Sequence, residues 1–113
     1  MSSTTDILET NEFSRYDLHL SFIKILGNEN VYFQPPESKK LKYPCIIYNL
    51  AGIDKRHADN DPYRSMKRYR VTVVDQDPDS VFPDKVNEMR LCSFVTHFNE
   101  DYLNHWVFEI YHK

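Results

Sequence analysis

The clearest pattern of apolar and polar positions lies between residues 43 and 80. Residues Pro44–Leu50 are almost all apolar, which is typical of a strand covered on both faces. Residues Lys67–Asp75 alternate instead, as a strand with one buried face does. One face carries Tyr69, Val71 and Val73, and the other carries Arg68, Arg70 and Thr72. The pattern predicts two strands joined by a long polar excursion, Asp54–Met66, with a turn at Gly52 before it.

An amphipathic helix is predicted ahead of these strands. Its apolar face has residues at helical spacing: Leu18, Phe22, Ile25 and Leu26. Ser14 is the expected N-cap with Asp17 three residues later, and Gly27 supplies the stop. Residues 1–12 are polar and rich in Ser and Thr, and we expect a flexible N-terminal segment there.

The remaining segments complete a small α+β pattern. Val31–Gln34 is a short extended segment, expected at a sheet edge or in a turn because the two prolines after it cannot donate ladder hydrogen bonds. A second helix is predicted over Ser80–Arg90, capped by Asp79, with Val81, Val86 and Met89 facing inward. Two more strands are predicted over Leu91–Thr96 and His105–Tyr111. Residues 13–113 should therefore form one α+β domain, a mixed or antiparallel sheet of four to five strands with two helices packed on one face.

The polar excursion is the candidate functional segment. It exceeds the usual connection length of about 12 residues, which points to a loop ordered by a partner. It mixes charges of both signs with one aromatic residue, a composition that suits a protein partner better than nucleic acid. A solvated surface loop is the alternative. The candidate subunit or partner contacts are Arg56, His57, Asp59, Asp61, Tyr63, Arg64 and Lys67.

Composition narrows the class of protein. The 113 residues carry a net charge of −3, which argues against binding to duplex nucleic acid through clustered cations. Aromatic residues make up 14% of the chain. They suit a packed core. The alternative is that some of them form exposed apolar surface for contacts between subunits. The chain has no signal-peptide pattern and no apolar run near the ~20 residues of a membrane helix, so we expect a soluble cytosolic product.

The residues that could carry chemistry do not combine into a known site. Asp75, Asp77 and Asp79 imitate the start of a calcium loop, but Ser80 and Val86 stand where that loop needs Gly and Glu. The five histidines show no metal-ligand spacing, and His19 is expected to lie on a helix flank without a role. With two glycines in the chain there is no phosphate-cradling loop. We therefore predict no enzyme, no cofactor and no metal.

The two cysteines, Cys45 and Cys92, both lie in apolar, strand-like runs. The spacing of the two cysteines in the sequence does not exclude a disulfide between them. Two buried, reduced thiols in a cytoplasmic protein are favoured. Neither cysteine sits where its pKa would fall, so neither is a candidate nucleophile.

Several strings in the chain resemble a family of small proteins of long-tailed bacteriophages, the tail terminator or tail completion proteins. The strings cover about residues 15–112: Tyr32-Phe-Gln-Pro-Pro-Glu, Leu41-Lys-Tyr-Pro-Cys-Ile-Ile-Tyr, Arg56-His-Ala-Asp-Asn-Asp-Pro-Tyr, Lys67-Arg-Tyr-Arg-Val-Thr-Val-Val-Asp-Gln-Asp-Pro-Asp-Ser, Pro83-Asp-Lys, Cys92-Ser-Phe and Asn104-His-Trp-Val-Phe. The resemblance implies an α/β subunit without catalytic chemistry that closes into a ring, typically a hexamer.

Such a ring caps the tail tube, ends tail polymerisation and forms the interface to the head connector. The implied partners are copies of this chain, the phage tail tube protein and a head connector or neck protein, with no membrane and no sequence-specific nucleic acid. The implied location is the head–tail junction of the virion, and the host cytoplasm during assembly. Two alternatives stay open: another neck or head–tail joining protein, and a monomeric regulatory or small-ligand module.

Overall fold

A computed structural model describes residues 15–58 and 61–112, with only the backbone for the described residues between 55 and 65. The predicted flexible segment, residues 1–12, and the predicted cap Ser14 lie outside the described residues. No helix among the described residues is long and apolar enough to cross a membrane.

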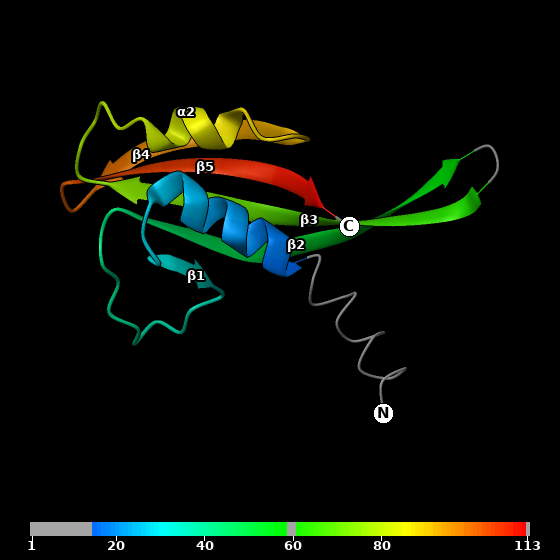
Figure 1. Ribbon diagram of the computed structural model, residues 1–113, viewed down its shortest axis with the longest axis horizontal. Helices are drawn as coiled ribbons and strands as arrows, with labels where there is room; N and C mark the ends of the chain where they lie inside the picture. Colours follow the sequence, from blue (N-terminus) through cyan, green and yellow to red (C-terminus); the bar gives the residue numbers. More distant parts are fainter. Residues whose placement is uncertain (1–14, 59–60, 113) are drawn as a thin grey trace.

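The fold is one five-stranded mixed sheet with two helices, as predicted (Figure 1). The strands are β1 Val31–Phe33, β2 Cys45–Ala58, β3 Asp61–Asp75, β4 Cys92–Glu100 and β5 Leu103–His112, in the spatial order β1-β2-β3-β5-β4. Only β1 and β2 pair in parallel; the other neighbours are antiparallel. The first helix covers residues 15–26, and α2 covers Phe82–Asn87.

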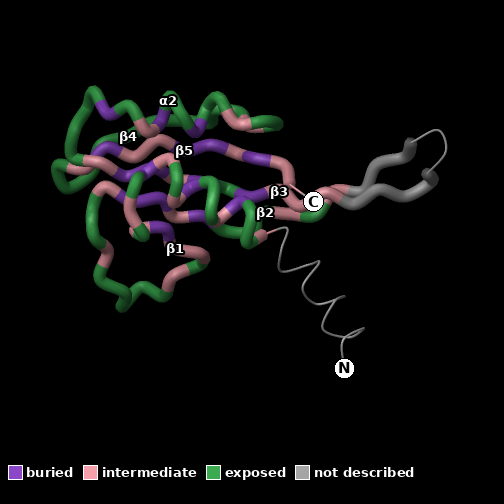
Figure 2. Tube along the Cα trace, viewed as in Figure 1, coloured by how far each residue is buried: buried purple, intermediate pink, exposed green. Residues whose placement is uncertain are grey.

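The core lies between the helices and one face of the sheet (Figure 2). The predicted stripe is confirmed, because Leu18, Phe22 and Leu26 are buried. The predicted alternation of β3 is confirmed as well, since Tyr69 and Val71 are buried on this face. Gly27 ends the first helix with a φ of 76°, a backbone conformation that glycine adopts without a steric penalty.

Tyr48 is the centre of this core. Its ring is fully buried and lies 4.9 Å from the ring of Phe33 and 5.3 Å from that of Phe22, centroid to centroid. Its hydroxyl is 2.7 Å from Nδ1 of His19 and accepts a weaker hydrogen bond from Arg15 at 3.5 Å. A histidine expected to be idle therefore satisfies a polar atom beneath the helix, where an unpaired hydroxyl would be costly.

This contact makes stability depend on pH. Burial, and then the positive charge of Arg15, lower the pKa of His19 below its ordinary value of 6.5. The folded protein then binds this proton less readily than the unfolded chain, so His19 favours unfolding as the pH falls through 6.5. The melting temperature should drop from about pH 8 to about pH 5, and less so in His19→Gln, which stays neutral. Equal drops in the two proteins would contradict this prediction.

The second helix is shorter than predicted and is capped differently. It begins after Val81, which makes no side-chain cap, while Oγ of Ser80 accepts a hydrogen bond from the N–H of Phe82. Asp79 is not the cap. The preceding acids form two successive turns instead, in which Asp75 accepts from the N–H of Asp77 and Asp77 from that of Asp79. Val81 is exposed rather than inward, whereas Val86 is buried as expected.

The largest correction concerns the polar excursion. It is a continuation of β2 and β3 that forms a long β-hairpin, not an irregular loop. Gly52 lies inside β2 beside a register shift after Leu50, and makes no turn. The backbone ladder between the two strands continues through this segment without a third strand beside it among the described residues. The sequence of the segment lacks the alternation of apolar and polar residues on which a strand prediction rests.

Candidate functional site

We define the arm as residues 54–66, the distal part of this hairpin. Its ladder runs from Asp54 opposite Met66 to Ala58 opposite Asp61. β1 pairs with β2 only as far as Tyr48, and β5 pairs with β3 only from Lys67 onward. Among the described residues the arm therefore has no sheet neighbour on either side, and Figure 1 shows it projecting beyond the rest of the sheet.

The predicted contact residues are gathered on this hairpin. The backbones of Arg56, His57, Asp61, Tyr63 and Arg64 belong to its two strands, and Lys67 stands at its base opposite Ile53. Asp59 lies outside the described residues. The register sets Arg56 directly opposite Arg64. Like charges at directly opposed positions weaken an antiparallel pair.

A cluster of charges lies at the base of the arm, on the sheet face that the helices leave open. Arg68 lies 3.7 Å from Asp54 and 3.4 Å from Glu109, and Arg70 lies 2.9 Å from the same Glu109 oxygen. Gly52 makes room for this cluster, because a Cβ there would stand 2.6 Å from a guanidinium nitrogen of Arg68. Sequence reasoning placed Arg68 and Arg70 on the open face and missed their partners. The glycine inside an extended run was the available signal.

β4 forms the other free edge of the sheet. It pairs with β5 alone, and eight of its nine residues are exposed. Three large apolar side chains stand in it, those of Phe94, Val95 and Phe98. A register shift between Phe94 and Thr96 leaves Val95 without a partner residue on β5, so Thr96–Glu100 is the regular part of the edge. The predicted strand over Leu91–Thr96 is confirmed but extends further, to Glu100.

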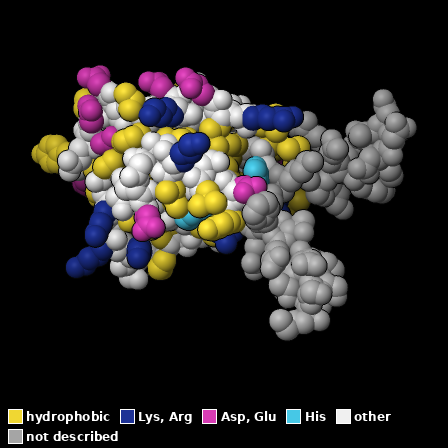
Figure 3. Space-filling view, in the orientation of Figure 1, with side chains coloured by type: hydrophobic (Ala, Val, Ile, Leu, Met, Phe, Trp, Pro, Cys, Tyr) yellow, Lys and Arg dark blue, Asp and Glu magenta, His cyan; other side chains and the backbone are white. Residues whose placement is uncertain are grey.

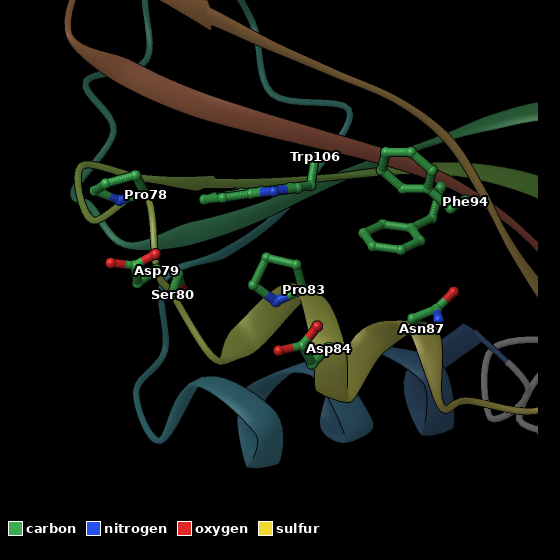
Figure 4. Close-up of a pocket in the computed structure, with 9 residues that line it drawn as sticks. Pro78, Asp79, Ser80, Pro83, Asp84, Asn87, Phe94 and Trp106 are labelled. Carbon is green, nitrogen blue, oxygen red and sulfur yellow. The ribbon is translucent and has the colours of Figure 1, made fainter.

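An open pocket lies beside this edge, between α2 and the ends of β4 and β5. Its volume is about 540 Å³. Figure 4 shows Trp106 and Phe94 on the sheet side, facing Pro83 of α2 across the gap. The carboxylates of Asp79 and Asp84 contribute to the lining, which contains no Lys or Arg. Acidic side chains also gather over α2 and the segment before it in Figure 3. The pocket thus combines an aromatic floor with an acidic rim.

A second pocket, of about 430 Å³, lies between the two helices. Its lining is apolar at Ile25 and Met89 and basic at Lys24, Lys85 and Arg90. The two pockets give the helix-covered side of the molecule surfaces of opposite charge.

The cysteines stay apart and unreactive. Both are free thiols; Cys45 is buried in β2 and Cys92 is half-buried at the start of β4. Burial raises the pKa of Cys45 to about 12, with a smaller contribution from Asp75, and raises that of Cys92 to about 11. A thiol that is protonated at neutral pH is a poor nucleophile. In the described part of the chain, no three His, Cys, Asp or Glu side chains are grouped so that they could hold a metal ion.

No family model, no curated protein and no solved structure matches this chain.

Proposed function

We propose that this protein is a structural subunit that assembles with copies of itself into a ring and caps the tail tube of a long-tailed phage. In that role it ends tail polymerisation and forms the interface to the head connector. The observation that carries the proposal is the arm, a two-stranded ribbon that projects beyond the sheet and has no neighbouring strand on either side among the described residues.

Two features favour assembly over an isolated subunit. Long unpaired edges and exposed apolar strands are features that monomeric proteins avoid, and this chain has them at opposite ends of its sheet. A ring uses a heterologous interface, in which one patch of each copy meets a different patch of the next. An arm at one end and an exposed edge at the other suit that arrangement.

The arm should contribute to association through its charge. Replacing Arg56 and Arg64 together by alanine should weaken self-association about tenfold, because their opposed charges would be neutralised by acidic groups of the neighbouring copy. The melting temperature should stay the same or rise slightly, since the mutual repulsion is removed. Sedimentation velocity and thermal unfolding measure the two quantities.

The matched control is Lys40→Ala with Lys42→Ala, which removes the same charge from exposed positions in the segment between β1 and β2. It should leave association unchanged. If both double variants weaken self-association equally, the effect comes from the net charge of the protein and not from the arm. A loss of melting temperature that matches the loss of association would make the arm a purely structural element.

The capping role is tested with tail tube protein. Adding this chain to polymerising tubes should shorten them and place a ring at one end in negative-stain images, and the Arg56→Ala/Arg64→Ala protein should do so less efficiently. Tubes of unchanged length without end rings, formed in the presence of assembled protein, would favour another joining role at the neck.

A further inference from the structure

We propose that the free outer edge of β2 in one copy pairs, antiparallel, with β4 of the next copy, so that the sheets of neighbouring subunits become continuous. This inference rests on the proposed function and names the surface that receives the arm. The occupant of the β4 edge is a second copy of this chain.

The topology provides the two halves of this contact. β1 covers only Ile46–Tyr48 of the 14-residue β2, so within residues 15–58 and 61–112 no strand pairs with the outer edge of β2 from Asn49 on. The one exception is the Leu50 N–H, which donates to the side chain of Gln34. β4 has 9 residues and occupies the opposite end of the sheet. Two edges of similar length, one at each end, are what head-to-tail pairing needs.

The strand directions agree with this pairing. β2 is antiparallel to β3, β3 to β5 and β5 to β4, so β2 and β4 run in opposite directions within one sheet. A rotation that carries one copy beside the next with their sheets in line therefore brings β4 antiparallel to β2. Antiparallel ladders have the more favourable hydrogen-bond geometry.

The two edges also carry exposed apolar side chains. Ile53 is 57% exposed and Leu50 is exposed, while β4 presents Phe94, Val95 and Phe98. In an antiparallel ladder that starts with Asn49 beside Glu100 and takes up the extra residue of β2 between Leu50 and Gly52, Ile53 comes beside His97, next to Thr96. The backbone of Lys55 then comes near that of Phe94, at the end of β4 beside the pocket with the acidic rim.

The main competing arrangement is a two-fold dimer in which β4 of one copy pairs with β4 of another. Isologous pairing of that kind is common in proteins. It would cover the β4 edge and leave the free edge of β2 and the arm without a partner. The two arrangements bring different residues together, so chemical cross-linking separates them.

Cross-linking of variants that each carry one added cysteine tests the inference. Ile53→Cys and Thr96→Cys each add one thiol at an exposed position. Within one copy these positions are three strand spacings apart across the sheet and, because Thr96 is in register with Ile47, also six residues apart along it. The separation therefore exceeds ~20 Å, and a shorter bis-maleimide cannot bridge it. Mixing the two variants should give at least about ten times more cross-linked dimer than either variant alone, because paired edges hold the two thiols at high effective concentration.

The double variant Ile53→Cys/Thr96→Cys should extend this product into a ladder that ends at the ring. Wild-type protein is the control for its two native thiols, which burial keeps protonated. Strong self-cross-linking of Thr96→Cys would overturn the inference in favour of the two-fold dimer. If wild-type protein assembles but the mixed variants give no cross-linked product, the pairing of β2 with β4 is also overturned. The ring would then assemble through another surface. A wild type that never assembles would overturn the proposed function and the inference together.

Discussion

Shortening the arm is expected to abolish self-assembly and to leave the body of the protein folded. Residues 54–66 can be replaced by Asn-Gly, because Ile53 and Lys67 stand directly opposite each other and a two-residue turn of that type closes an antiparallel pair. The replacement removes the distal free edge of β2 and the opposed arginines together. Association should weaken more than about a hundredfold, which corresponds to roughly 2.7 kcal/mol.

The stability of the shortened protein should change little. The only ion pair lost among the described residues is the one between Asp54 and Arg68, at 3.7 Å and partly exposed, a kind that contributes little. Thermal unfolding followed by circular dichroism checks the fold, and light scattering checks the mass. Unchanged assembly by a shortened, folded protein would show that the arm is dispensable.

Replacing Tyr48 by alanine is expected to lower the free energy of unfolding by about 3–5 kcal/mol, as for other large aromatic side chains removed from a core. The residue is fully buried and packs against the rings of Phe22, Phe33 and Tyr69. Its loss would leave a cavity beneath the first helix. Urea unfolding measures the change.

Tyr48→Phe is the matched control. It keeps the ring and removes the hydroxyl that contacts His19 and Arg15, and should cost about 0.5–1.5 kcal/mol. The difference between the two variants separates packing from hydrogen bonding. A cost below about 1 kcal/mol for Tyr48→Ala would contradict the assignment of Tyr48 to the centre of the core.

The parts of the fold that could be predicted from sequence are those with a buried face. The first helix and the alternating half of β3 were predicted because their apolar residues repeat at 3.6 and 2 positions, and the same residues form the core. The segment of β1 was expected at an edge or in a turn because two prolines follow it, and β1 is an edge strand.

The parts that could not be predicted are stabilised in other ways. The arm is a two-stranded ribbon joined by its backbone ladder, and its polar sequence lacks the alternation that predicts a strand, so a loop was predicted there. The far end of β4 is an exposed edge with few apolar residues. The predicted strand therefore ended at Thr96, because no alternation of apolar and polar residues continues beyond it. The cap of α2 was assigned to Asp79, because sequence alone does not show which of several neighbouring acids forms a turn.

The candidate site was found only in part. The excursion was selected for its length and charge, and the structure gathers most of its residues on one hairpin. The β4 edge and the pocket beside it were missed, because edge position and pocket lining depend on contacts between distant segments. Phe94 and Trp106 were read simply as strand residues, and their place in the pocket follows from the packing of α2.

The most direct test of the central claim is the solution mass of the full chain, by light scattering behind a sizing column over a concentration series. We predict a species near six times the subunit mass of 13.5 kDa, growing at the expense of monomer as the concentration rises. A mass that stays at 13.5 kDa up to the solubility limit would contradict self-assembly and with it the proposed role.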